Sequence, residues 1–209
     1  MNDQKKYYTE EDGITGYWEK RYVEWLKTPD WGVFETKAAW FNSRFAHILP
    51  IPKEPKGLVL DYGCGNGMYS VPLLQRFENY VGMDTSPTAI EIARNRLGQS
   101  RQRAFWLSRE NPKDGWQPFP AYDLVISITV LQHQPVSRRR DIIEWIKGVI
   151  KPGGMYVGLE MQGNTQAFDM PPMPEDDWRK AWEPFTIRHD VPKEHPEWAQ
   201  DNVWFTDPK

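Results

Sequence analysis

The chain has 209 residues, of which 39% are hydrophobic and 26% are charged, a balance typical of a globular protein with one sizeable core. The net charge of −3 argues against nucleic acid as the main partner, because proteins that bind phosphates usually carry a basic surface. The single cysteine, Cys64, excludes an internal disulfide framework. The polar start of the chain and the lack of any apolar run of about 18 residues predict a cytoplasmic protein without a membrane segment.

Residues 1–56 are predicted to form an N-terminal helical extension, and residues 57–209 the main domain. Apolar residues recur with helical spacing over 16–27 and again over 34–49, and prolines follow the second run. The extension is too short to fold as an independent domain. We therefore expect it to pack over the functional site of the main domain.

The most informative stretch runs from Gly57 to Gly67. Its apolar start over 57–62 predicts a buried strand, which ends in Asp61 and Tyr62. Glycines follow at every second position, and the next residues, 68–77, have a helical pattern. Glycines in such a turn allow positive φ and let a ligand approach the backbone, while the helix N-terminus favours an anionic group. The spacing D-x-G-x-G-x-G differs from the G-x-G-x-x-G of dinucleotide-binding turns.

Strands and helices alternate after this turn. Further strands are predicted over 80–84, 104–107, 122–128 and 155–160, with helices over 87–97 and 137–150 and a turn over 151–154. A short helix over 174–182 precedes two strands, 185–191 and 202–206, which have no helix between them and suit an antiparallel hairpin. This order predicts an α/β fold with a doubly wound, mostly parallel seven-stranded sheet and an antiparallel C-terminal hairpin.

Four motifs in this order carry a family resemblance. They are the glycine turn, Asp84 at the end of the second strand, the Tyr-Asp-Leu-Val run that begins at Tyr122, and the Lys-Pro-Gly-Gly turn that begins at Lys151. Together they resemble the class I S-adenosylmethionine-dependent methyltransferases of the small-molecule type. The resemblance implies a Rossmann-like fold, S-adenosyl-L-methionine as cofactor and S-adenosyl-L-homocysteine as product.

The resemblance also implies which residues bind the cofactor. Asp84 is the acidic residue that holds the ribose, as in other nucleotide-binding Rossmann-like folds. Tyr22 belongs to a W-x-x-R-Y segment that such enzymes fold over the cofactor, where its ring can face the sulfonium; packing of the helix explains the same residues. The full set implied for the cofactor is Tyr22, Asp61, Gly63, Cys64, Gly65, Gly67, Asp84, Thr85, Ser108, Arg109, Ser127 and Thr129.

Catalysis of methyl transfer requires mainly that nucleophile, methyl carbon and sulfur are held in line, with a base only where the acceptor loses a proton. His133 is the first candidate base and Glu160 a weaker one, while the loop and strand that carry them offer a structural explanation of both residues. The acceptor is assigned to Trp18, His133, Arg138, Met161 and Trp178. The four histidines lack a compact ligand spacing, so no metal is predicted.

The sequence therefore predicts methyl transfer to an oxygen or nitrogen atom of a small-molecule acceptor, acidic or aromatic in character. A methyltransferase acting on RNA, a nucleotide or a protein side chain is one alternative. A non-catalytic cofactor-binding partner subunit is another, because loss of catalysis need not alter any motif. The protein is expected to be a monomer or a homodimer.

Overall fold

The computed structural model describes residues 13–98, 103–107, 121–161, 174–190 and 201–207. The chain divides into two compact units, Met1–Ser108 and Arg109–Lys209, and each is described by itself. The residues of the predicted extension, 1–56, fall within the first unit. The boundary predicted at residue 56 stays a prediction.

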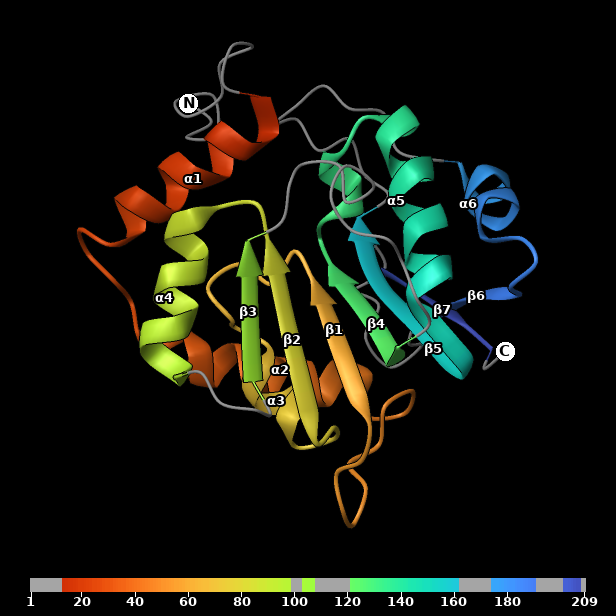
Figure 1. Ribbon diagram of the computed structural model, residues 1–209, viewed down its shortest axis with the longest axis horizontal. Coiled ribbons are helices and arrows are strands. Elements are labelled where there is room, and N and C mark those ends of the chain that lie inside the picture. Colours follow the sequence, from red (N-terminus) through yellow and green to blue (C-terminus); the bar gives the residue numbers. More distant parts are fainter. Residues whose placement is uncertain (1–12, 99–102, 108–120, 162–173, 191–200, 208–209) are drawn as a thin grey trace. The chain divides into compact units, whose positions relative to one another are not determined.

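The first unit contains a parallel sheet of β1 (Leu58–Tyr62), β2 (Asn79–Asp84) and β3 (Arg103–Leu107) (Figure 1). β2 lies between the other two strands, pairing Tyr62 with Met83 on one side and Asp84 with Leu107 on the other. The apolar run of β1 is buried, as expected for a strand covered on both faces. The carboxyl ends of β1 and β2 therefore meet at one edge of this sheet.

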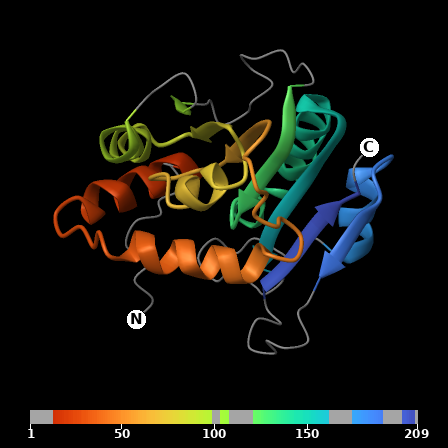
Figure 2. The same ribbon diagram turned by 90° about the horizontal axis from the view of Figure 1, so that it is seen from below.

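The helices of the first unit are α1 (Gly13–Trp25), α2 (Val33–Phe45), α3 (Ser70–Leu74) and α4 (Pro87–Leu97), and Figure 2 shows α2 beside α3. α4 begins as predicted, because the hydroxyl of Ser86 accepts a hydrogen bond from the backbone N–H of Ala89 and Pro87 follows it. α3 is shorter than the predicted 68–77, since the glycine turn continues to Tyr69.

The second unit contains β4 (Tyr122–Ile128), β5 (Ile150–Met161), β6 (Ile187–Asp190) and β7 (Asp201–Thr206). β5 pairs parallel with β4 and antiparallel with β7, which in turn pairs antiparallel with β6. The predicted turn over 151–154 is a bulge inside β5, because Tyr122 pairs with Ile150 while Leu124 pairs with Met155. The described residues of this unit also form the 3₁₀ helix η3 (Leu131–His133), α5 (Val136–Val149) and α6 (Glu175–Trp182).

The core of the second unit is rich in aromatic side chains. Trp182 of α6 stacks on Tyr156 of β5 with ring centroids 4.1 Å apart, and Trp178 stacks on Trp204 of β7 at 6.0 Å. All four rings are buried. These contacts hold α6 on the antiparallel end of the strands, although its sequence is mostly charged.

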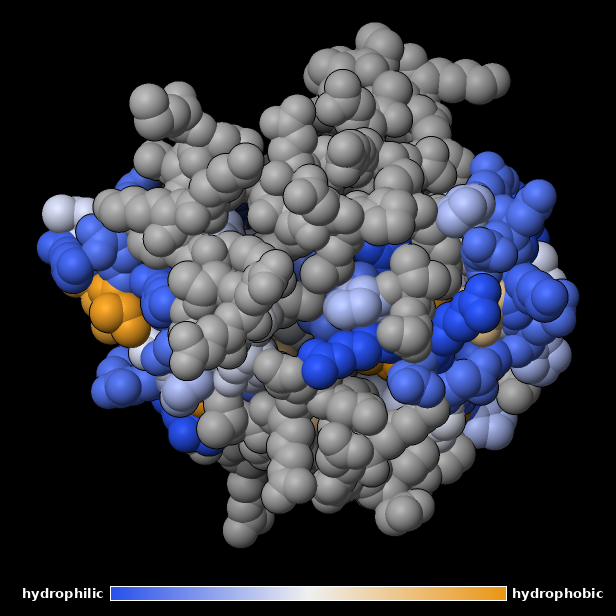
Figure 3. All heavy atoms as spheres, turned by 90° about the horizontal axis from the view of Figure 1, so that it is seen from above, coloured by the Kyte–Doolittle hydropathy of each residue, from blue (hydrophilic) through white to orange (hydrophobic). Residues whose placement is uncertain are grey.

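The predicted fold class, α/β with a mostly parallel seven-stranded sheet and an antiparallel C-terminal hairpin, is confirmed. No helix in the described ranges is both long and apolar enough to cross a membrane. Hydrophilic side chains prevail among the described atoms of the face drawn in Figure 3.

Candidate functional site

The glycine turn is fastened to the end of β2 by its own backbone. The N–H groups of Gly63 and Cys64 both donate to the carbonyl of Met83, at 2.7 and 3.0 Å. The N–H of Gly65 donates to the carboxylate Oδ2 of Asp84 at 2.8 Å. The motif and the acid that sequence analysis placed together thus form one hydrogen-bonded structure.

Two glycines of this turn are required for different reasons. Gly65 has φ of +54°, and a Cβ on it would lie 2.2 Å from the hydroxyl oxygen of Tyr22. Gly67 has φ of +74°, and its Cβ would lie 2.9 Å from Leu97 of α4. The missing side chain of Gly65 therefore leaves room for the Tyr22 hydroxyl of α1, whereas that of Gly67 lets α4 pack closely against the turn.

Tyr22 reaches into the turn from α1. The backbone N–H of Asn66 donates to its hydroxyl, and burial, with Asp84 and Cys64 nearby, raises the pKa of Tyr22 well above its ordinary value. Trp18 lies one turn earlier on α1, with its ring centroid 6.5 Å from that of Tyr22. The structure therefore brings Tyr22 to the predicted turn and places Trp18 beside it on the same helix.

Two carboxyl groups lie close to the turn, the half-buried Asp84 and the buried Asp61. Asp84 accepts hydrogen bonds from Gly65 and, at 2.9 Å, from the N–H of Ser86, yet burial raises its pKa above the ordinary value. Asp61 is 1% exposed and accepts a 2.8 Å hydrogen bond from the hydroxyl of Tyr80. Burial, against the opposing effect of that hydrogen bond, raises the pKa of Asp61 to about 7. Burial also raises the pKa of the Cys64 thiol, with Asp61 and Asp84 adding to the effect.

The raised pKa of Asp61 predicts a pH-dependent stability that Asp61→Asn removes. The ordinary pKa is 3.8 and the folded value about 7, so the fold binds more protons than the unfolded chain between these values. The free energy of unfolding of the wild type, minus that of Asp61→Asn, should therefore fall as the pH rises from 4 to 7, by at most about 1.4 kcal/mol per pH unit. Urea unfolding at pH 5 and pH 8 measures this difference. Parallel behaviour of the two proteins would contradict the prediction.

One residue near the turn was missed by sequence analysis. Glu19 of α1 accepts hydrogen bonds from the hydroxyls of Ser86 and Thr88 and from the N–H of Thr88, at the start of α4. No local pattern indicates these contacts, because the partners lie 67 and 69 residues apart in sequence. Glu19 is also a variable position of the W-x-x-R-Y segment, so the motif does not indicate a role for it.

The second unit has its own polar cluster at the ends of β4 and β5. Glu160 is 2% exposed and accepts hydrogen bonds from the hydroxyl of Ser127 at 3.1 Å and from the N–H groups of Leu131 and Gln132, at 3.2 and 2.9 Å. Burial raises its pKa to about 7, against these hydrogen bonds and the nearby Arg139. These hydrogen bonds from Leu131 and Gln132 to Glu160 hold η3 in place.

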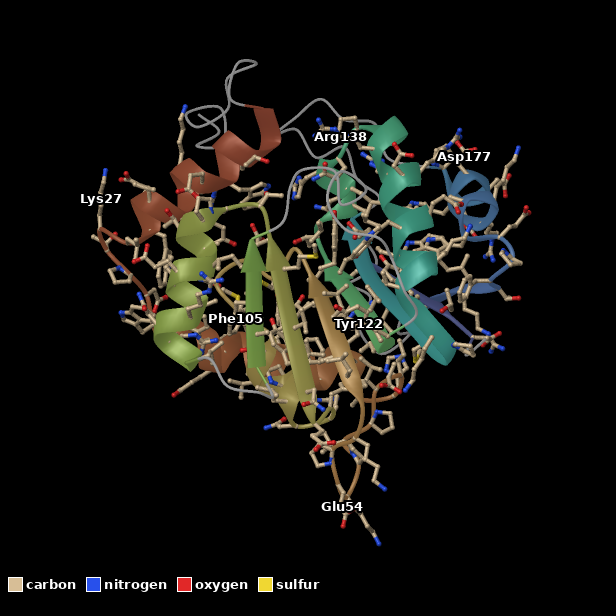
Figure 4. The ribbon with its side chains drawn as sticks, viewed as in Figure 1. Lys27, Glu54, Phe105, Tyr122, Arg138 and Asp177 are labelled. Carbon is tan, nitrogen blue, oxygen red and sulfur yellow. The ribbon has the colours of Figure 1, made fainter. Side chains whose placement is uncertain are left out.

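The histidine and arginine candidates follow directly after this cluster. His133 ends η3, and its Nε2 lies 3.3 Å from the side-chain nitrogen of Gln132. Arg138 lies in the first turns of α5 (Figure 4). Arg139 is buried, and it donates to the carbonyls of Gln134 and Gln132 at 2.6 and 3.0 Å. The arginines of this helix therefore differ, since Arg139 anchors the loop and Arg140 is exposed.

Thr129, which follows β4, has φ of +56°, a conformation that a β-branched residue rarely adopts. Its N–H donates to the carbonyl of Leu159 at 2.7 Å, which holds this backbone in place. Strained residues of this kind gather at ligand sites. The geometry is therefore compatible with the predicted role of Thr129, which stays a prediction.

Relief of this strain should make Thr129→Gly more stable than the wild type. The left-handed conformation costs about 1–2 kcal/mol, and the added chain entropy of glycine offsets about 0.5–1 kcal/mol of the gain. We expect a net rise of up to about 1 kcal/mol in the free energy of unfolding, measured with urea. Thr36→Gly, on the exposed face of α2, is the control and should lose about 0.3 kcal/mol, the difference between the helix propensities of the two residues. Equal losses in both variants would contradict the prediction.

The remaining predicted residues are placed as follows. Gly63, Thr85 and Ser127 lie at the ends of their strands, while Trp178 is buried against Trp204. Met161 ends β5, and its side chain, like Ser108 and Arg109 as a whole, lies outside the described residues. In the described part of the chain, no group of three or more His, Cys, Asp or Glu side chains is arranged to hold a metal ion.

Several known proteins with similar sequences are methyltransferases. A family model described as a methyltransferase domain matches residues 60–156. Trans-aconitate 2-methyltransferase of Rhodococcus jostii is 32% identical over 111 residues, which cover 52% of this chain and 39% of that protein. Ubiquinone biosynthesis O-methyltransferase of Cereibacter sphaeroides is 28% identical over 153 residues, covering 73% and 59%. The chain thus spans less than two thirds of the length of either relative.

A solved structure extends the likeness over most of the chain. The N-methyltransferase NodS from Bradyrhizobium japonicum, in complex with S-adenosyl-L-homocysteine, superposes with a TM-score of 0.66 at 16% identity, covering 92% of this chain and 99% of that one. The glycine turn, the acid that ends β2 and the antiparallel hairpin define a Rossmann-like protein of the methyltransferase type. The resemblance that the motifs predicted is thus confirmed: residues 60–156 match a methyltransferase domain, and the fold is similar to that of solved methyltransferases.

Proposed function

We propose that this protein transfers a methyl group from S-adenosyl-L-methionine to an oxygen or nitrogen atom of a small-molecule acceptor. The observation that carries the proposal is the hydrogen bond between Gly65 and Asp84, which joins the open glycine turn to the acid at the end of β2. This arrangement gives a nucleoside ligand both a close backbone approach and a carboxylate for its ribose.

The residues of the turn fit this cofactor. The Tyr22 hydroxyl lies so close to Gly65 that a Cβ on this glycine would be 2.2 Å from it, so only glycine brings the backbone this near to Tyr22. The two oxygens of Asp84 offer about four lone pairs, and the backbone N–H groups of Gly65, Thr85 and Ser86 leave at least one of them for a ribose hydroxyl. The buried carboxyl of Asp61 suits a cationic amino group, which would favour its ionised form. When bound, the cofactor supplies a methyl group on a positively charged sulfur, already activated toward a nucleophile.

The acceptor is assigned to residues of the second unit. His133 is proposed as the base for an acceptor that loses a proton, because a neutral imidazole has a nitrogen that can accept one. Glu160 is proposed to position η3, the segment that carries His133, through its hydrogen bonds to Leu131 and Gln132. Arg138 is proposed to attract an acidic acceptor. The names of the two relatives, a trans-aconitate methyltransferase and an O-methyltransferase, support oxygen of a small molecule as the acceptor.

Calorimetry and an acceptor screen test this proposal. S-adenosyl-L-methionine and S-adenosyl-L-homocysteine are each titrated into the protein, and product release is then followed with small acids, phenols, amines, RNA and protein substrates. Binding of both compounds and turnover with a small acceptor are expected. Failure of both compounds to bind would overturn the proposal. Turnover with RNA or protein alone, or binding without any turnover, would favour the corresponding alternative.

A further inference from the structure

We infer that Glu19 is a positioning residue for the cofactor, a latch that fastens α1 to the start of α4 and so holds Tyr22 over the glycine turn. Release of the cofactor then requires the latch to open. The inference rests on the proposed function, because the ligand concerned is its cofactor.

The latch consists of three hydrogen bonds to one carboxylate. Oε2 of Glu19 accepts from the hydroxyl of Ser86 at 2.5 Å and from the N–H of Thr88 at 3.2 Å, and the hydroxyl of Thr88 donates to Oε1. Burial tends to raise the pKa of Glu19, but the donors outweigh it and the pKa is lowered. The group is therefore ionised at neutral pH and is bound more strongly than a neutral acceptor would be.

The latch and the turn share a single hydrogen-bonded path. Ser86, which donates to Glu19, also donates its N–H to Asp84 at 2.9 Å. Asp84 in turn accepts from Gly65, the residue against which the hydroxyl of Tyr22 lies. Glu19 and Tyr22 are three residues apart on α1, so they face the same side of the helix. The carboxylate and the phenol thus hold α1 at two points, one on α4 and one on the turn.

The contacts of Glu19 exceed what the capping of α4 needs. The hydroxyl of Ser86 already accepts from the N–H of Ala89, so α4 has a cap from its own sequence. Glu19 adds a second acceptor at the same helix end, and this acceptor comes from another helix. Because α4 is already capped, the hydrogen bonds of Glu19 serve to fix the position of α1 and of its residue Tyr22.

Dissociation kinetics test the latch. Complexes with S-adenosyl-L-homocysteine are mixed with excess S-adenosyl-L-methionine analogue in a stopped-flow instrument, and tryptophan fluorescence reports release. Glu19→Gln and Thr88→Val should each raise the dissociation rate, with Glu19→Gln giving roughly a 10-fold increase because charge-assisted hydrogen bonds are lost. Glu24→Gln is the control, since Glu24 of the same helix pairs with Lys27 at the surface, and its rate should match the wild type.

A double-mutant cycle separates positioning from general loss of stability. In a Tyr22→Phe background, Glu19→Gln should change the dissociation rate by less than about twofold, because the latch acts through the Tyr22 hydroxyl. Equal, multiplicative effects in both backgrounds, or a wild-type rate in Glu19→Gln, would overturn the inference while leaving the proposed function intact. A wild-type protein that binds neither compound would overturn the proposed function itself.

Discussion

Gly65→Val is expected to lower the affinity for S-adenosyl-L-homocysteine by more than about 100-fold, or ~2.7 kcal/mol. Valine is β-branched and is strained at φ of +54°. Its Cβ would also lie 2.2 Å from the hydroxyl oxygen of Tyr22, so either Tyr22 or the turn must move. Both movements disturb the hydrogen bond from Gly65 to Asp84. Calorimetric titration at equal protein concentration measures the loss.

Gly98→Val is the matched control for this variant. Gly98 also has a positive φ, +66°, but no atom of a described residue lies within 4 Å of a Cβ at that position. With ψ of 166°, Gly98 has a backbone conformation that almost only glycine adopts, so the substitution should introduce backbone strain without blocking the turn. We expect Gly98→Val to be less stable by about 1–3 kcal/mol and to bind the ligand with wild-type affinity. Wild-type affinity in Gly65→Val would show that the ligand does not use this turn.

Arg139→Met should lower the free energy of unfolding by about 3 kcal/mol. The guanidinium is buried and donates to the carbonyls of Gln132 and Gln134, which would lose a charged donor. Arg139 also favours the ionised form of Glu160, so its removal should raise the pKa of that carboxyl further. Methionine keeps much of the side-chain volume, so the loss reports the polar contacts rather than a cavity.

Chemical denaturation of Arg139→Met and of Arg140→Met distinguishes the anchor from its exposed neighbour. Arg140 lies in the same turn of α5 and is exposed, so its replacement should change the free energy of unfolding by no more than about 0.5 kcal/mol. Similar losses in the two variants would mean that helix propensity or net charge, rather than the anchoring of the loop, sets the stability.

The sequence predicted those features that depend on neighbouring residues. The apolar run before Asp61, the alternating glycines and the Ser86-Pro87 start of α4 each carry a local signal, and the structure confirms the elements they predict. The order of strands and helices then limits the fold to very few topologies. The prediction of the cofactor came from the family motifs, because the hydrophobic patterns specify only secondary structure.

The contacts that the sequence did not predict join residues far apart in the chain. Glu19 reaches Ser86, Tyr80 reaches Asp61, and their side chains meet only after the strands and helices have packed. Arg139 is the middle one of three consecutive arginines in the sequence, and its burial in the folded chain is what distinguishes it from the other two. The early end of α3 likewise depends on the length of the turn before it. Such features follow from tertiary packing, which single-residue patterns do not encode.

The buried thiol of the glycine turn has a consequence for the chemical resilience of the protein. Thiolates, rather than thiols, react with oxidants and alkylating agents, and the pKa of Cys64 is raised by burial and by two neighbouring carboxyl groups. Cys64 is also the one cysteine of the sequence. The folded protein should therefore tolerate oxidising surroundings that inactivate enzymes with exposed thiols. Any modification of Cys64 would mark molecules in which the turn had come apart from β2.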